Sequence, residues 1–211
     1  MIQTWIADVS PLYEKEIYLQ YYYAVPKWRQ EKADRIQKHP DKALSIGAWA
    51  LLQQLEKEYS LRENYLYNIS HSGNCVLCSI EDEKGKSSRL GCDLEKVKLS
   101  WNRKVAERFF RKSEYFRIRD CGNEGEQREL FFRYWVLKES FLKATRVGLS
   151  LGMDSFEIGF SDEDKPYLMD KPQTFWEEYY FREYAVDGLP YRIAVCADCE
   201  DFAPKIRVAT L

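Results

Sequence analysis

The chain has 211 residues, of which 45% are hydrophobic and 31% charged, as is usual for a globular protein. Its formal net charge of −2 excludes a strong overall attraction to nucleic acid. No run of ~18 apolar residues is present, so we expect no membrane span. The start of the sequence lacks the features of a signal peptide, and six cysteines in such a chain indicate reduced thiols and a cytoplasmic location.

The first part of the chain predicts a strand, a basic segment and a long helix. Alternating side chains over residues 2–6 are typical of a strand. Residues 27–42 are rich in lysine and arginine, and we expect residues 39–41 to break this segment, because the residue before a proline avoids the helical region. Apolar residues at helical spacing then predict an amphipathic helix over residues 44–59.

The middle of the chain alternates polar and apolar segments. Residues 68–73, with the sequence N-I-S-H-S-G, predict a polar turn. The apolar run 75–80 is typical of a buried strand, and residues 90–95 of a half-buried one.

The second part of the chain predicts two helices followed by strands. The helices are expected over residues 106–116 and 129–146, with Gly148 ending the second. Alternating residues predict strands at 156–160 and 191–197. The order of elements predicts an α+β fold with two similar halves, residues 1–100 and residues 101–211.

Asp93 and Glu95 are candidate metal ligands. They lie two residues apart on the predicted strand, so both side chains project the same way, ~6–7 Å apart. Mg²⁺ prefers oxygen ligands and commonly takes one or two carboxylates together with phosphates. The alternative is an acidic pair on a solvated face.

Glu139 and Lys143 share one face of the predicted helix over residues 129–146, since they are four positions apart. One interpretation is a surface ion pair. The other is that the two side chains line a cleft, because this helix is unusually rich in aromatic residues. If Glu139 joins Asp93 and Glu95, three carboxylates would repel one another unless a cation were bound.

His71 lies between Ser70 and Ser72 and directly before Gly73. An imidazole, two hydroxyls and turn backbone groups in this arrangement can donate hydrogen bonds to a phosphate. The alternative is a loop histidine without a partner.

Three motifs together resemble those of surfactin-type (Sfp-type) 4′-phosphopantetheinyl transferases. They are N-I-S-H-S-G, then G-C-D-L-E, then W-V-L-K-E-S-F-L-K-A, in the family's order and with similar spacing. The resemblance implies two similar α+β halves with the active site between them, in a protein that is usually a monomer. It also implies transfer of the phosphopantetheine arm of coenzyme A to a serine of an acyl, polyketide or peptidyl carrier protein, with release of 3′,5′-ADP.

The resemblance also implies roles for the motif residues. Asp93, Glu95 and Glu139 would bind Mg²⁺, and Glu139, or a water that it holds, would take the proton of the carrier serine. Lys143 would stabilise the transferred phosphoryl group. Ser70 and His71 would bind the phosphates of coenzyme A, and Lys138 would flank the site.

Further contacts are implied outside the motifs. The family uses upstream basic residues for the 3′-phosphate of coenzyme A, and we expect these to be Arg35, Lys38 and Lys42. The carrier protein would dock on an apolar surface after the G-C-D-L-E strand, where Trp101 and Val105 are candidates and burial in the core is the alternative.

The sequence departs from the family's pattern at two places. Residues 62–67 lack the lysine of a G-K-P-like segment, and Arg146 replaces a glycine, where it either crowds the site or adds a phosphate contact. A degenerate homologue that binds coenzyme A or a carrier protein without transfer therefore remains an alternative. A Mg²⁺-dependent phosphohydrolase on the same carboxylates is another.

Two C-x-x-C pairs leave a structural zinc site as a further alternative. Four cysteines are enough ligands for one zinc ion. Cys75 and Cys78, however, lie on a predicted strand, where residues three apart point to opposite faces. Buried thiols that behave as small hydrophobic side chains are the simpler interpretation.

Overall fold

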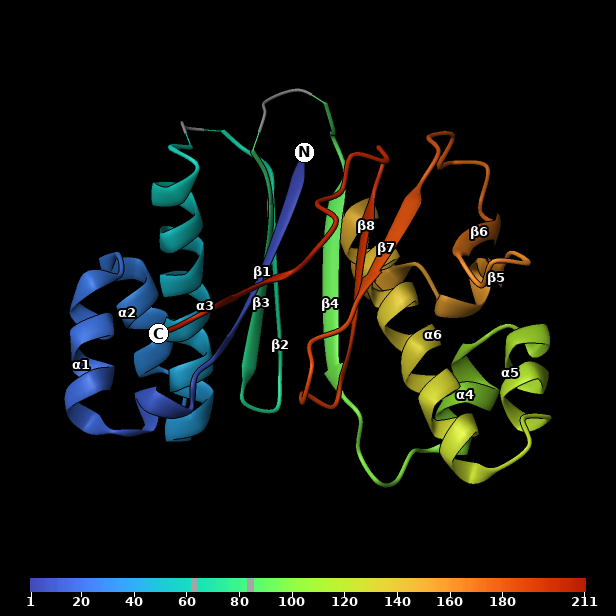
Figure 1. Ribbon diagram of the computed structural model, residues 1–211, viewed down its shortest axis with the longest axis horizontal. Helices are drawn as coiled ribbons and strands as arrows, with labels where there is room; N and C mark the ends of the chain where they lie inside the picture. The colour runs from blue at the N-terminus through green and yellow to red at the C-terminus, as the bar shows by residue number, and fades with distance from the viewer. Residues whose placement is uncertain (62–63, 83–85) are drawn as a thin grey trace.

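Two β-sheets lie face to face between two layers of helices (Figure 1). The computed structural model describes residues 1–61, 64–82 and 86–211. Residues 62 and 63 of the segment that lacks the family's lysine lie outside this range. The predicted α+β fold is confirmed, since a mixed arrangement of helices and sheets is observed.

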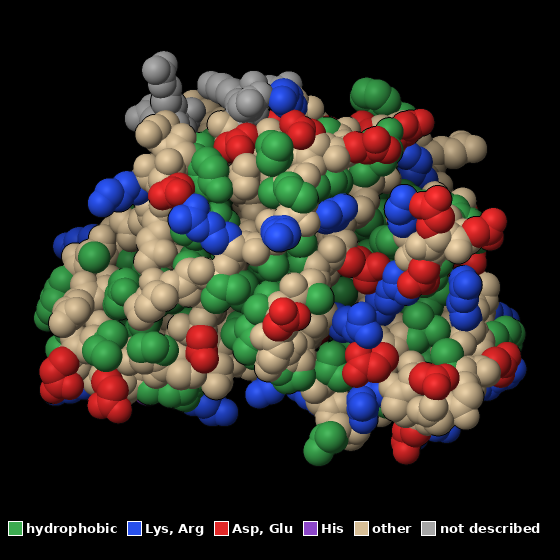
Figure 2. Space-filling view, in the orientation of Figure 1, with side chains coloured by type: hydrophobic (Ala, Val, Ile, Leu, Met, Phe, Trp, Pro, Cys, Tyr) green, Lys and Arg blue, Asp and Glu red, His purple; other side chains and the backbone are tan. Residues whose placement is uncertain are grey.

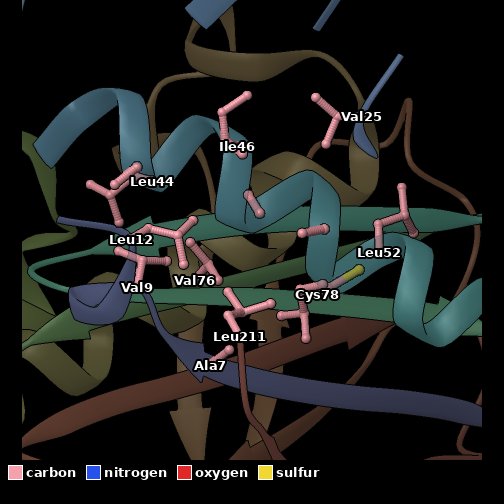
Figure 3. Packing of buried hydrophobic residues seen from close by; sticks show 14 of the residues in the cluster. Ala7, Val9, Leu12, Val25, Leu44, Ile46, Leu52, Val76, Cys78 and Leu211 are labelled. Carbon is pink, nitrogen blue, oxygen red and sulfur yellow. The ribbon is translucent and has the colours of Figure 1, made fainter. Parts of the chain in front are cut away.

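The first helical layer covers one face of the first sheet (Figure 1). It consists of α1 (Lys15–Ala24), α2 (Lys27–Asp34) and α3 (His39–Glu58). The break expected at residues 39–41 lies instead at residues 35–38, and residues 39–41 form the first turn of α3, where Pro40 fits because its missing N–H is not needed. Buried residues of α3 such as Ile46 and Leu52 pack toward Val76 and Cys78 of the sheet (Figure 3).

The first sheet has the strand order β2-β3-β1-β9. Its strands are β1 (Ile2–Asp8), β2 (Tyr67–Ser72), β3 (Cys75–Glu81) and β9 (Arg207–Ala209). The prediction of a turn over residues 68–73 is wrong for most of that segment, because residues 67–72 pair with β3 as an antiparallel strand. The tight turn is at Gly73, whose φ of 56° lies in the left-handed region, and a Cβ there would meet the Tyr191 hydroxyl at 2.5 Å.

The second sheet has the strand order β4-β8-β7. Its strands are β4 (Leu90–Lys96), β7 (Tyr180–Tyr184) and β8 (Tyr191–Ala197). Apolar side chains of both sheets fill the space between them, including Ile6 and Leu77 from the first sheet and Leu94 and Ile193 from the second. The strand β4, from the first part of the chain, thus pairs with a later strand, and β9, from the end of the chain, joins the first sheet. The division of the chain into two halves at residue 100 stays a prediction.

The second helical layer covers the outer face of the second sheet (Figure 1). It contains α4 (Arg103–Phe109), α5 (Lys112–Arg119), α6 (Glu124–Thr145) and a small sheet of β5 (Glu157–Phe160) and β6 (Pro166–Asp170). Short 3₁₀ turns lie at Ser10–Tyr13, Gly148–Ser150 and Met153–Ser155. In the described residues, no helix combines the length and apolar character needed to cross a bilayer.

Two predicted helix boundaries differ from the structure. The single helix expected over residues 106–116 is two helices, because the chain is extended at Phe110 and Glu114 accepts a hydrogen bond from the Arg111 N–H at the start of α5. The long helix begins at Glu124 and ends at Arg146, which adopts a left-handed φ of 60°, two residues before the expected Gly148.

Candidate active site

The helix α6 packs directly on β4 at Gly91. A Cβ built on this glycine would lie 2.1 Å from the carbonyl oxygen of Ser140 and 2.4 Å from the backbone nitrogen of Ala144. Only a residue without a side chain allows this approach, and it brings the helix face that carries Glu139 and Lys143 over the acidic strand.

Lys143 joins three oxygen atoms from β2 and β4. Its Nζ atom lies 2.7 Å from Oδ1 of Asp93, 2.9 Å from Oγ of Ser70 and 3.0 Å from the carbonyl oxygen of Cys92. The Ser70 hydroxyl also donates to Asp93 Oδ1 at 2.7 Å. Burial opposes the charge of Lys143, but Asp93, Cys92 and Glu139 together outweigh that effect, and the pKa of the lysine is raised.

Glu95 has its own hydroxyl donor on β2. The Ser72 hydroxyl donates to Oε2 of Glu95 at 2.6 Å, two positions along both strands from the pair of Ser70 and Asp93. Asp93 and Glu95 therefore face the same edge strand of the other sheet, in agreement with the strand periodicity.

The carboxylates of the site influence one another. Burial raises the pKa of Glu139, and the negative charges of Asp93 and Glu95 raise it further. Burial also raises the pKa of Asp93, although Lys143 and Ser70 act in the opposite direction. The charges of Asp93 and Glu95 on β4 therefore act on Glu139 of α6.

The donor set at these carboxylates fits a hard divalent cation. Oδ2 of Asp93 is buried and has no hydrogen-bond partner in the described residues, which leaves one oxygen of a buried carboxylate uncompensated. Oxygen ligands from carboxylates are those that Mg²⁺ prefers. The side chains do not already form a cage, since no three His, Cys, Asp or Glu residues within the described ranges are grouped closely enough to hold a metal.

His71 projects from the face of β2 opposite to the two serines. Its neighbour Ile69, two positions away, packs against the core beneath α3, and strand alternation places the imidazole on that same side. The residue is exposed, yet enough protein surrounds the ring that desolvation lowers its pKa, and Lys143 lowers it further. The charges of Asp41 and Lys32 also act on the ring, so the start of α3 and the end of α2 lie near it.

The structure does not bring Lys138 to the carboxylates, which corrects its predicted position at the site. Its Nζ atom is fully buried on another face of α6, 2.8 Å from Oε1 of Glu114, and it donates to the carbonyl oxygens of Met153 and Phe156. Consecutive residues on a helix point ~100° apart, so adjacency to Glu139 in the sequence does not imply a shared face.

Of the upstream basic residues, Arg35 and Lys38 lie in the connection between α2 and α3, and Lys42 lies in the first turns of α3. Arg35 and Lys38 are exposed and Lys42 is half-buried, and no contact between them and the carboxylates is found in the described residues. Lys32 of α2, which the sequence did not single out, acts with burial and Lys143 to lower the pKa of His71. On the face in Figure 2, acidic and basic side chains are interspersed rather than gathered into a broad basic surface.

The predicted docking residues are partly buried. Trp101 stacks near Phe131 with ring centroids 5.2 Å apart, and Val105 packs against the same core. The more exposed apolar side chains of this segment are Leu99, with 92% of its surface accessible, and Phe109, with 43%. Trp101 and Val105 are therefore partly buried in the core, which was the alternative to a role in docking.

The cysteine pair on β3 points to opposite faces. Cys75 packs between the two sheets, whereas Cys78 packs beneath the helices of the first layer. One metal ion therefore cannot take both thiols, as the strand geometry predicts. Burial raises the pKa of each thiol, in keeping with buried apolar side chains.

The family model of the 4′-phosphopantetheinyl transferase superfamily matches residues 89–196, which hold β4, α6 and β8. The chain belongs to this superfamily. It is 35% identical to the 4′-phosphopantetheinyl transferase Sfp of Bacillus subtilis over 144 residues, which cover 68% of this chain and 60% of that protein. The chain thus spans less than two thirds of that relative's length.

Other relatives match over a shorter part of the chain. The L-aminoadipate-semialdehyde dehydrogenase-phosphopantetheinyl transferase of Mus musculus is 34% identical over 120 residues, covering 54% of this chain and 36% of that protein. Among solved structures, the holo-[acyl-carrier-protein] synthase of Thermotoga maritima superposes with a TM-score of 0.44 at 24% identity, covering 53% of this chain and 62% of that chain.

Proposed function

We propose that this chain transfers the 4′-phosphopantetheine arm of coenzyme A to a serine of an apo carrier protein and releases 3′,5′-ADP. The observation that carries the proposal is the network of Lys143, Asp93 and Ser70, in which three separate motifs meet at one place. Membership of the superfamily supports the same activity.

The residues of the site suit this reaction. Attack of a serine hydroxyl on the pyrophosphate of coenzyme A builds negative charge on phosphate oxygens, which Lys143 can offset through its ammonium group. Glu139, or a water that it holds, is the base that takes the serine proton. Ser70 already donates to Asp93, so we assign it to aligning Asp93 and Lys143 as well as to binding phosphate.

We infer that Asp93, Glu95 and Glu139 hold Mg²⁺, with Oδ2 of Asp93 as the oxygen that lacks another partner. The ion, when bound, neutralises charge on the pyrophosphate of coenzyme A. The remaining contacts with coenzyme A are assigned to His71 and to the basic residues of α2, α3 and the connection between them, namely Lys32, Arg35, Lys38 and Lys42.

We propose that the carrier protein docks beside the segment that follows β4. The exposed side chains of Leu99 and Phe109 offer it an apolar contact, which Trp101 and Val105 support from beneath. An acyl, polyketide or peptidyl carrier protein fits this proposal, and a monomeric enzyme in the cytoplasm remains our prediction.

The test is the intact mass of an apo carrier protein after incubation with this protein, coenzyme A and Mg²⁺. We expect a gain of one phosphopantetheine unit, which is lost in Glu139→Ala and after chelation of the metal. Coenzyme A binding without transfer to any carrier class would instead identify a degenerate homologue. Release of free phosphopantetheine would identify a hydrolase.

A further inference from the structure

The free edge of β4 is hydrogen-bonded by side chains where a sheet would normally continue with another strand. The opposite edge pairs with β8. On the free edge, the N–H of Cys92 donates to Oδ1 of Asn68 at 3.0 Å, and the N–H of Lys96 donates to Oγ of Ser72 at 3.1 Å. The carbonyl oxygen of Cys92 accepts from Lys143. Edge groups that would otherwise be unpaired are thus satisfied from β2 and α6.

The Ser72 hydroxyl has a fixed orientation as a result. Its oxygen accepts from the Lys96 N–H, so its single proton is free to donate to Glu95, 2.6 Å away. This bond holds one carboxylate oxygen of Glu95. The other oxygen makes no hydrogen bond to the described residues, so it is available to a ligand.

Asn68 acts at the other end of the same edge. Its side-chain oxygen holds the Cys92 N–H, and its carbonyl oxygen lies 3.2 Å from Sγ of Cys92. Asn68, Ser70 and Ser72 alternate along β2, so all three reach β4 from one side of the strand. They therefore set how far β2 and β4 are displaced along each other.

We propose that Asn68 and Ser72 are positioning residues of the transferase site, which fix the register of β4 against β2 and thereby orient Asp93 and Glu95 for the metal. This inference rests on the proposed function. It assigns a role to two residues of the N-I-S-H-S-G motif that need not touch coenzyme A.

Residues that hydrogen-bond to a metal ligand are expected to raise the affinity for the metal, because a ligand side chain that rotates freely must be ordered when the ion binds. Loss of such a partner typically lowers metal affinity or activity by about 10–100-fold. The expected signature is therefore a weaker Mg²⁺ site in a protein that is still folded.

The experiment is a calorimetric titration of MgCl₂ into the coenzyme A complexes of the wild-type protein and of Ser72→Ala, Ser72→Thr and Ser113→Ala, with a blank titration into coenzyme A alone. Ser113 is a matched control, because its hydroxyl also donates to a glutamate at 2.6 Å, but on the exposed surface of α5 toward Glu157. We expect Ser72→Ala to weaken Mg²⁺ binding by about tenfold. Ser72→Thr, which keeps the hydroxyl, should restore it, and Ser113→Ala should not change it.

A second variant separates positioning from simple loss of stability. Asn68→Ala should also raise the Mg²⁺ concentration for half-maximal transfer, with the melting temperature recorded alongside, while a destabilising change outside β2 and β4, such as Gly188→Ala, should leave that concentration unchanged. Equal Mg²⁺ affinities of the wild type and Ser72→Ala would overturn the inference.

The two proposals fail in different ways. Wild-type protein that binds Mg²⁺ but transfers nothing to a carrier would refute the transferase function, while the calorimetric comparison would still decide the role of Ser72. Wild-type protein that binds no Mg²⁺ in the presence of coenzyme A would refute both.

Discussion

The Nζ atom of Lys143 lies 2.7 Å from Oδ1 of Asp93, and this ion pair joins the longest helix to the edge strand of the second sheet. The Asp93 side chain keeps only 7% of its surface accessible, against 28% for Lys143. A carboxylate at this depth is ionised at low cost only when a cation accompanies it. Lys143, for which we propose a role in transfer, thus also stabilises the fold.

Replacement of Lys143 by methionine should therefore destabilise the protein as well as stop transfer. We expect a loss of about 3 kcal/mol in the free energy of unfolding, because the buried Asp93 keeps its charge and loses its partner. Urea denaturation at neutral pH measures this loss. The double variant Lys143→Met/Asp93→Asn should recover part of it, and equal stability of the single and double variants would show that the loss does not come from an unpaired charge on Asp93.

Gly91→Ala should separate α6 from β4. The added Cβ would meet backbone atoms of Ser140 and Ala144, which cannot move without shifting the helix, so we expect a loss of about 3 kcal/mol or more and little transfer. Gly188→Ala is the control, since nothing lies within 4 Å of its Cβ position and only its φ of 76° is unfavourable. Its cost should be about 1 kcal/mol. Similar losses in the two variants would argue against the close helix–strand contact.

Lys138→Met should give a pH-dependent loss of stability. At pH 7 we expect a loss of about 3–5 kcal/mol, because Glu114 becomes an unpaired buried charge. Burial raises the pKa of Glu114 and Lys138 lowers it, so removal of the lysine raises that pKa further. A carboxyl with a raised pKa in the folded state favours folding below its unfolded value of about 4.3 and loses this contribution as pH rises.

The deficit of Lys138→Met relative to the wild type should consequently shrink as the pH is lowered from 7 toward about 4.5. Denaturation curves at several pH values test this expectation. The variant Lys138→Met/Glu114→Gln has no such carboxyl, and its deficit should be nearly independent of pH over the same range. A constant deficit in the single variant would mean that Glu114 does not titrate there.

Arg146→Gly should stabilise the protein. Arg146 ends α6 with φ of 60°, a conformation that is strained for residues with a Cβ and favourable for glycine. We expect a gain of about 0.5–1 kcal/mol by chemical denaturation. Arg146→Ala keeps the Cβ and should show no such gain, so an equal gain in both variants would point to charge rather than backbone strain.

The sequence predicted the regions with strong apolar periodicity and missed those whose structure depends on distant partners. The strand over residues 2–6, the helix over residues 44–59 and the strand over residues 191–197 all appear in the structure. Residues 68–72 look like a turn because their side chains are polar. They form a strand because β4 satisfies those polar side chains, which local propensity does not report.

The candidate site was predictable to a similar degree. Strand spacing correctly indicated that Asp93 and Glu95 share a face, and helical spacing indicated the shared face of Glu139 and Lys143. The position of Lys138 was not readable, because its partner Glu114 comes from another helix. The preference of Lys143 for Asp93 over Glu139 depends equally on the tertiary packing at Gly91.

The pairing of β4 with a strand from near the end of the chain has a consequence for synthesis on the ribosome. Residues 90–96 form β4, but their hydrogen-bonded partner β8 comes from residues 191–197. At about 5–20 residues per second, β4 leaves the ribosome roughly 5–20 s before β8. During this interval the backbone edge that pairs with β8 is open, and Asn68 and Ser72 are neighbours already made that can hold the other edge. Nascent chains stalled within residues 101–190 should therefore be the form of this protein most dependent on chaperones.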